Sequence, residues 1–133
     1  MLTEKLQQAA ALHAQGFNCA QSVALPFCDE LGIDRKLAMR ALEGFGAGMG
    51  GMQQTCGALS GAVFVAGLKH SDGNLEAPAS KKATYAVCRQ LSERFVAECG
   101  SGVCAAIKGI DSGKPLCSCD ACIALGVRLA YEA

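Results

Sequence analysis

Nine cysteines stand out among the 133 residues of this sequence. Four of them are each predicted to lie in the first turn of a different helix: Cys19, Cys56, Cys104 and Cys122. The unpaired N–H groups and the dipole at a helix start favour a thiolate, whereas cysteines that only fill a core should fall anywhere along apolar stripes. Thiolates bind metals, exchange with disulfides or react as nucleophiles. These four positions therefore predict a shared metal or redox site.

The residues before these cysteines are suited to capping helices. Ser, Thr, Asn and Asp side chains accept hydrogen bonds from the first amides of a helix. We expect each of the four helices to begin at such a residue: Asn18 before Cys19, Thr55 before Cys56, Ser101 before Cys104, and Ser118 or Asp120 before Cys122. The four thiols then lie on separate helices that can converge in a bundle.

Three of the other cysteines, Cys28, Cys88 and Cys99, fall on apolar faces of predicted helices and are interpreted as small core residues. Cys117 and Cys119 lie just before the last helix and are alternates for its metal ligand.

The segment Cys119-Asp-Ala-Cys122 is also a C-x-x-C pair astride a helix cap, as in reactive dithiols. The candidates for redox-active thiols are accordingly Cys56, Cys104, Cys119 and Cys122.

A glycine-rich stretch precedes the Cys56 segment, with five glycines between residues 44 and 51. Glycine loses the most conformational freedom on ordering, so this stretch is expected to be a loop that is present for a reason. The expected reason is that backbone passes close to a buried site and presents N–H donors to sulfur, at Gly46, Gly48, Gly50 and Gly51. The stretch matches G-x-G-x-x-G, but a helix precedes it where a dinucleotide site needs a strand.

Apolar periodicity predicts an all-α protein, a single domain of residues 1–133 with about six helices around a buried central helix, 56–68. Small residues four apart in that helix, such as Gly57 and Gly61, allow another helix to approach closely. Pro26 should kink the helix that begins at Cys19. Asp34 should cap the next one, with Leu37, Ala38, Ala41, Leu42 and Phe45 facing inward, and a long helix should cover about 78–99.

The composition narrows the classes of function. Twelve basic and twelve acidic residues leave no electrostatic footprint for nucleic acid or membrane surfaces. The amphipathic start of the chain lacks a signal region, so we expect a cytoplasmic location. In a reducing compartment, nine thiols favour metal binding or redox chemistry over a disulfide framework.

The sequence also resembles a known family. Gly16-Phe-Asn-Cys-Ala-Gln-Ser-Val23, the glycine loop, Cys56-Gly-Ala-Leu-Ser-Gly61, the Cys104 segment and Cys122 look like the C-GCAxxG-C-C family of small bacterial and archaeal proteins described as redox-active. The resemblance implies that the signature cysteines correspond to Cys19, Cys56, Cys104 and Cys122. A similar region of split-Soret cytochromes is associated with an iron–sulfur centre, but this chain has no C-x-x-C-H for covalent haem.

Together these observations predict a redox protein that binds an iron–sulfur cluster for electron transfer, as an electron carrier or an oxidoreductase. One alternative is thiol–disulfide chemistry, for example between Cys56 and Cys104, with no cofactor. Another is a structural zinc site of four cysteines. The expected partner is another redox protein, and the small-residue helix faces could also support a homo-oligomer.

Overall fold

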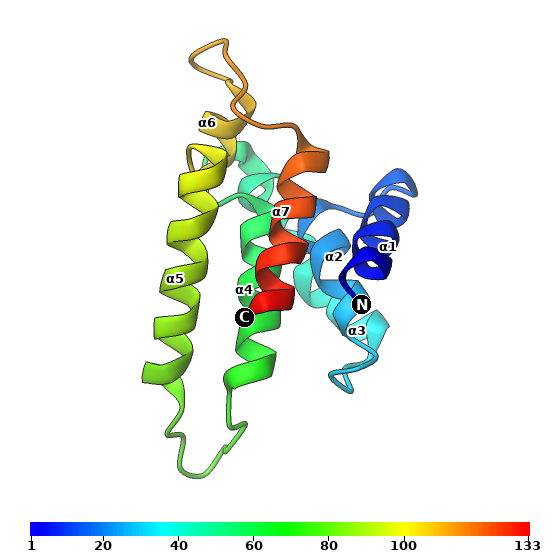
Figure 1. Cartoon of the computed structure of the whole chain (residues 1–133), viewed down its shortest axis with the longest axis vertical. Helices are drawn as coiled ribbons and strands as arrows, with labels where there is room; N and C mark the ends of the chain where they lie inside the picture. The colour runs from blue at the N-terminus through cyan, green and yellow to red at the C-terminus, as the bar shows by residue number, and fades with distance from the viewer.

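The computed structural model describes all 133 residues as helices joined by turns and loops, without a strand (Figure 1). The α-helices are α1 (Leu2–Ala14), α2 (Cys19–Ala24), α3 (Arg35–Leu42), α4 (Gly57–His70), α5 (Lys81–Cys99), α6 (Cys104–Lys108) and α7 (Cys119–Glu132). Short turns η1 (Leu25–Phe27) and η2 (Glu43–Phe45) continue α2 and α3, and η3 (Gly48–Met52) lies between η2 and α4. The prediction of an all-α, single-domain bundle is confirmed. None of the helices combines the length and the hydropathy needed to cross a membrane.

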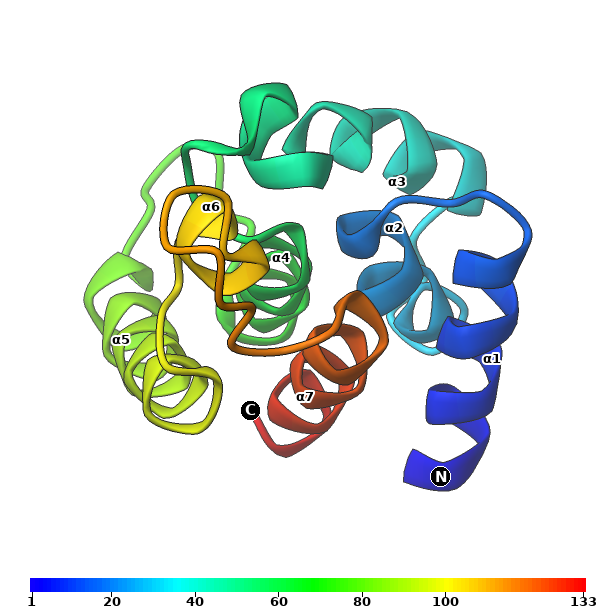
Figure 2. The same cartoon turned by 90° about the horizontal axis from the view of Figure 1, so that it is seen from above.

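Helix α4 lies in the middle of the bundle, with α2, α5 and α7 packed around it (Figure 2). Glycines make this packing close. A Cβ at Gly61 would lie 2.6 Å from the carbonyl oxygen of Ala20 in α2. A Cβ at Gly126 in α7 would lie 2.8 Å from the carbonyl oxygen of Ala58 in α4. The expected role of small residues on the central helix is therefore confirmed, because larger ones would separate these backbones.

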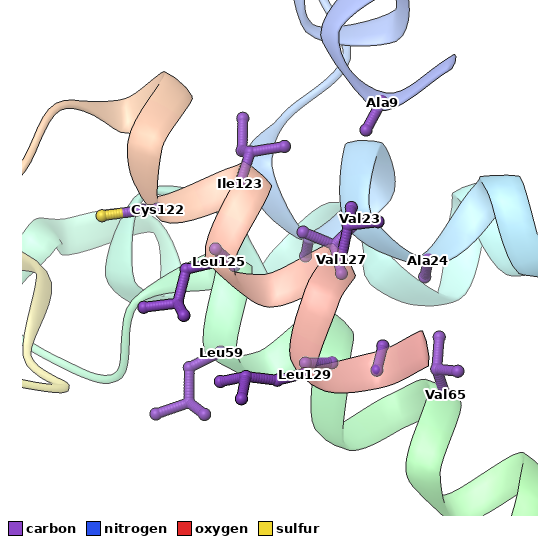
Figure 3. Close-up of a cluster of buried hydrophobic side chains, with 14 of the residues drawn as sticks. Ala9, Val23, Ala24, Leu59, Val65, Cys122, Ile123, Leu125, Val127 and Leu129 are labelled. Carbon is purple, nitrogen blue, oxygen red and sulfur yellow. The ribbon is translucent and has the colours of Figure 1, made fainter. Parts of the chain in front are cut away.

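The core is built mainly from apolar side chains of α2, α4 and α7 (Figure 3). Val23, Val65 and Val127 come from these three helices and are completely buried. Cys122 lies at the edge of this group, and its sulfur points away from the labelled apolar side chains (Figure 3). Cys122 therefore belongs both to the hydrophobic core and to the group of cysteines beside it.

Several boundaries differ from the sequence prediction. The central helix covers Gly57–His70, so Cys56 is its N-cap residue and Thr55 lies outside it. Helix α2 ends at Ala24 and continues as the 3₁₀ turn η1, because Pro26 has no amide N–H and its ring crowds an α-helical turn. Helix α5 begins at Lys81, after the predicted start at Pro78.

Helix α3 buries a narrower face than predicted. Ala38 and Leu42 are buried, but Leu37 and Phe45 are 59% and 41% exposed and Ala41 is exposed as well. Helix α3 packs at the margin of the bundle, mainly against α2 and the turn η1. Only one narrow face of α3 is therefore buried. Phe45 lies in a 3₁₀ turn, where three residues per turn shift it out of the α-helical stripe.

Candidate functional site

Five cysteines line one small cavity of about 20 Å³ at one end of the bundle: Cys19, Cys56, Cys104, Cys119 and Cys122. They come from the starts of α2, α4, α6 and α7, and the starts of α4, α6 and α7 lie at the upper end of the molecule in Figure 1. Ala47, Gly57, Ile107 and Lys108 complete the wall. The four cysteines predicted from helix starts are therefore brought together around a common space.

The Cys19 position is held by a capping box at the start of α2. Asn18 Oδ1 accepts from the amide of Gln21 at 2.9 Å, and Gln21 Oε1 accepts from the amide of Asn18 at 3.0 Å. The side-chain amide nitrogen of Asn18 donates to the carbonyl of Glu43 at 2.9 Å. The predicted Asn18 cap is confirmed, and it also connects the start of α2 to the segment that leads into the glycine loop.

Cys56 and Cys104 are aligned by a short antiparallel bridge between Thr55 and Val103. The amide of Cys56 donates to the carbonyl of Gly102 at 2.7 Å, and the amide of Cys104 donates to the carbonyl of Gln54 at 2.8 Å. Thr55 and Ser101 were expected to be N-caps, but the N-cap residues are Cys56 and Val103. That prediction was wrong because Thr55 is paired with another segment, and the Ser101 hydroxyl accepts from the amide of Val103 instead.

The start of α7 presents two cysteines. The Ser118 hydroxyl accepts from the amide of Ala121 at 3.1 Å, which confirms Ser118 as the cap and leaves Asp120 within the helix. Cys119 is the first residue of the helix and Cys122 is the fourth. Both line the cavity, so Cys119 takes the helix-start position that was predicted for Cys122.

Two glycines of the loop lie directly against the site. A Cβ at Gly48 would be 2.5 Å from Cys104 Cβ and 3.4 Å from its sulfur, and a Cβ at Gly46 would be 2.5 Å from the Asn18 side chain. Gly50 and Gly51 have no such neighbour within 4 Å, and neither residue lines the cavity. Close backbone approach is therefore seen at two of the four predicted loop glycines.

The same loop has an unusual backbone. Ala47, Gly48, Met49 and Gly50 have φ angles of 51°, 58°, 61° and 83°, which make a left-handed turn. Non-glycine residues in this region are disfavoured by roughly 1–2 kcal/mol each. Such strain is concentrated at functional sites, and here it carries Ala47 and Gly48 over the cysteine cavity.

A second group of sulfurs adjoins the cavity. The sulfur atoms of Cys99, Cys117 and Cys122 all lie within 4.8 Å of one another, and this cluster could hold a metal ion. Cys99 and Cys122 are 3.3 Å apart, at hydrogen-bonding distance for thiols. The interpretation of Cys99 as a core residue is incomplete, because its buried side chain also belongs to this cluster. In the sequence, the position of Cys99 only five residues before Cys104 could have indicated that it lies near the site.

Two cysteines remain separate. Cys28 and Cys88 line neither the cavity nor the three-sulfur cluster. The buried Cys28 thiol donates to the carbonyl of Ala24 in its own turn. Their interpretation as packing residues agrees with these positions.

The pKa of the Cys56 thiol is lowered by its surroundings. Its pKa is lowered from the usual 9.0 to about 6, first by the Cys122 thiol, which donates a hydrogen bond to the Cys56 anion. Burial acts in the opposite direction, while the amides of Ala58 and Leu59 at the start of α4 and the cation of Lys108 add to the lowering. Cys56 is therefore largely a thiolate at neutral pH.

The other three predicted ligands behave differently. Burial raises the pKa of Cys19 to about 11 and also raises the pKa of Cys104. The pKa of Cys122 is raised because its thiol donates a hydrogen bond to the Cys56 anion, and burial raises it further. The expectation of a thiolate at each of the four helix starts is therefore wrong for this structure. Burial and the neighbouring Cys56 anion outweigh the dipoles of helices as short as α2 and α6.

Comparison with known proteins identifies a family for this chain. Residues 17–133 match the family model described as "Putative redox-active protein (C_GCAxxG_C_C)". The chain belongs to the C_GCAxxG_C_C family. All nine cysteines of this C_GCAxxG_C_C chain lie within the matched residues. No curated protein and no solved structure matched it.

Proposed function

We propose that this C_GCAxxG_C_C protein transfers electrons by means of an iron–sulfur cluster held by Cys19, Cys56, Cys104 and Cys122. The observation that carries the proposal is the convergence of cysteines from four helices on one cavity. Sulfur donors suit iron–sulfur clusters, zinc and copper(I). Zinc does not change its oxidation state, so iron better suits a family described as redox-active.

The residues around the cavity are of the types that bind an iron–sulfur cluster. Its wall offers cysteine sulfurs and no histidine or carboxylate, and Lys108 is the one charged residue in it. A lysine there offsets part of the negative charge that four thiolates bring, and net charge is one of the factors that set the potential of a cluster. The lowered pKa of Cys56, about 6, favours the thiolate form in which cysteine binds metals.

The size of the cavity adds a requirement. Its volume of about 20 Å³ is close to that of one water-sized sphere. The sulfurs that lie within 4.8 Å of one another are those of Cys99, Cys117 and Cys122, so a single ion held by Cys19, Cys56, Cys104 and Cys122 requires these side chains to turn inward. A cluster is larger than this cavity and requires them to turn outward. The ratio of iron to sulfide in the purified protein separates these two forms of the centre.

A bound cluster would supply one-electron transfer without the making or breaking of substrate bonds. The chain itself supplies the sulfur ligands on the starts of α2, α4, α6 and α7, and the loop at Ala47 and Gly48 closes the cavity. Cys56, Cys104 and Cys122 are 6%, 4% and 2% exposed, so water has little access to their sulfurs. Reactive thiols that exchange with other proteins are usually more exposed, and this burial favours a metal centre.

Anaerobic purification followed by iron, zinc and acid-labile sulfide analysis tests the proposal, together with an absorption spectrum before and after reduction by dithionite. We expect a brown protein with iron and sulfide in similar amounts, bleached by the reductant. A colourless protein with bound zinc would overturn the proposal in favour of a structural site. A colourless protein without metal would overturn it in favour of thiol chemistry.

A thiol–disulfide function is the second candidate, because the sulfurs of Cys99 and Cys122 lie 3.3 Å apart beside the Cys56 thiolate. Two thiols would lose two electrons and two protons to a small disulfide such as oxidised glutathione, which would be released as two thiols. Peptide mapping of protein oxidised in this way tests the idea. A specific Cys99–Cys122 or Cys56–Cys122 disulfide supports it, and random pairing of all nine cysteines contradicts it.

A further inference from the structure

A second cavity, of about 460 Å³, adjoins the cysteine site. It lies where η2, α4 and α5 meet. Thr55 lines this cavity, and the next residue, Cys56, lines the cysteine cavity. Sites for small molecules usually have roughly 300–1,000 Å³, so this space is large enough for a ligand that would lie next to the redox centre.

The wall of the cavity is uncharged. Leucine, valine and phenylalanine side chains make most of it, and no acidic, basic or cysteine residue takes part. Phe45 and Phe64 bring aromatic rings from η2 and α4. Phe45 is 41% exposed, although a large aromatic side chain gains from burial. A flat, uncharged ring would cover this exposed face without the cost of burying a charge.

Three hydroxyl groups add hydrogen-bonding capacity to the apolar wall. They belong to Thr55, to Ser60 on α4 and to Ser92 on α5. Ser60 and Ser92 are also the two serines whose hydroxyls form no side-chain hydrogen bond within the protein. The serines that do are Ser22, Ser71, Ser80, Ser101, Ser112 and Ser118.

Free hydroxyls on two facing helices can donate to acceptor atoms of a ligand that lies between them. Because the rest of the wall is apolar, those acceptors should be few and fixed on a ring. Carbonyl oxygens attached to an uncharged ring meet this requirement, and they are the defining groups of quinones.

We propose that this cavity binds an uncharged aromatic ring compound with carbonyl oxygens, of the quinone class, through the Ser60 and Ser92 hydroxyls and the two phenylalanine rings. None of the residues that form the cavity is a cysteine. The proposed contacts therefore include none of the metal ligands, and binding can be tested whether or not the protein carries iron.

The probe is 2,3-dimethyl-1,4-naphthoquinone, whose fully substituted quinone ring offers no open position for addition of a thiol. Its binding to the full chain is measured anaerobically by equilibrium dialysis, beside 2,3-dimethylnaphthalene, which has the same shape and lacks the carbonyls. We expect the quinone to bind in the micromolar range and the naphthalene at least about tenfold more weakly, which corresponds to about 1.4 kcal/mol.

Variants locate the site. Ser92→Phe fills the cavity from α5 and should weaken quinone binding at least about tenfold. Ala97→Phe adds the same ring at an exposed position of the same helix, outside this cavity, and should bind like the wild type. The double variant Ser60→Ala/Ser92→Ala should weaken the quinone and leave the naphthalene unchanged, and circular dichroism checks the fold of each protein.

Other outcomes would overturn the inference. Failure of the wild type to bind the quinone excludes the site, and equal binding of both probes excludes carbonyl recognition. A dimer in sedimentation velocity that Ser92→Phe abolishes and Ala97→Phe retains would mean that a second copy covers this surface. Because iron content is measured separately, a protein that lacks iron and still binds the quinone contradicts only the proposed electron-transfer function.

Discussion

Gly48 lies so close to Cys104 that no side chain fits between them: a Cβ at Gly48 would be 2.5 Å from Cys104 Cβ. The left-handed turn around Gly48 brings the loop over the first residue of α6. This contact links the glycine-rich segment to a predicted metal ligand. The role of the loop in metal binding can therefore be tested by substitution at Gly48.

Substitution of Gly48 by alanine should disturb the site more than the fold. Gly50→Ala is the matched control, because Gly50 also has a positive φ, of 83°, but has no neighbour within 4 Å. Both variants should lose about 1 kcal/mol of unfolding free energy from backbone strain. Only Gly48→Ala should lose more than half of the bound iron, because Cys104 must move. Equal iron content in the two variants would make the loop a simple connection.

Removal of single cysteines should divide the nine into two groups. Cys28→Ala and Cys88→Ala should retain full metal content, because neither residue lines the cavity or the adjoining cluster. Cys122→Ala should lose the centre most completely, since Cys122 belongs to both groups of sulfurs. Metal analysis of each purified variant measures this.

The same series assigns the ligand set. We expect Cys19→Ala, Cys56→Ala and Cys104→Ala to lose the centre, and Cys117→Ala and Cys119→Ala to retain it. Loss of metal from Cys119→Ala with retention in Cys122→Ala would make Cys119 the α7 ligand. Loss from both Cys99→Ala and Cys117→Ala would move the centre to the three-sulfur cluster.

The stability of the reduced apoprotein should depend on pH through Cys56. Its pKa is about 6 in the folded protein and 9.0 ordinarily, so the folded state favours the anion. The resulting stability is fully present above pH 9 and is lost as the pH falls through 6. Urea unfolding should therefore show the free energy of unfolding rising from pH 6 to about 8, and Cys56→Ser should abolish that rise.

At higher pH the trend should reverse. The pKa values of Cys19 and Cys99 are raised to about 11, chiefly by burial, so the folded state favours their neutral thiols. That contribution is present below pH 9 and is lost as the pH rises through 11. The ultraviolet absorbance of thiolates gives a second readout: the wild type should show a titration step near pH 6 that Cys56→Ser lacks.

The close packing of α4 and α7 should depend on Gly126. Gly126→Ala places a Cβ 2.8 Å from the Ala58 carbonyl oxygen. Such overpacking should cost about 1–3 kcal/mol of unfolding free energy. Gly67→Ala is the control within α4, where a Cβ meets nothing within 4 Å, and it should stabilise the protein by up to about 1 kcal/mol. Urea unfolding of both variants measures the difference, and equal effects would show that the helices can move apart without cost.

Local chemistry in the sequence was sufficient to predict the helices and several of their caps. Asn18, Asp34 and Ser118 cap α2, α3 and α7 as expected, because a cap depends on residues within about three positions. The apolar stripes likewise indicated an all-α bundle with a small-residue helix at its centre. These features depend on residues that are close together in the chain, so they can be predicted from the sequence.

The tertiary structure alone decided how the sulfurs are arranged and in which direction the pKa values of the buried thiols are shifted. The pairing of Thr55 with Val103 joins segments that are far apart in the chain, and it displaced the predicted cap and aligned Cys56 with Cys104. The approach of Cys99 to Cys122 likewise depends on α5 and α7 meeting at one end of the bundle. The Cys122 thiol lowers the pKa of Cys56, whereas burial raises the pKa values of Cys19 and Cys104, because hydrogen bonding, desolvation and charge repulsion depend on every neighbour in space, whatever its position in the chain.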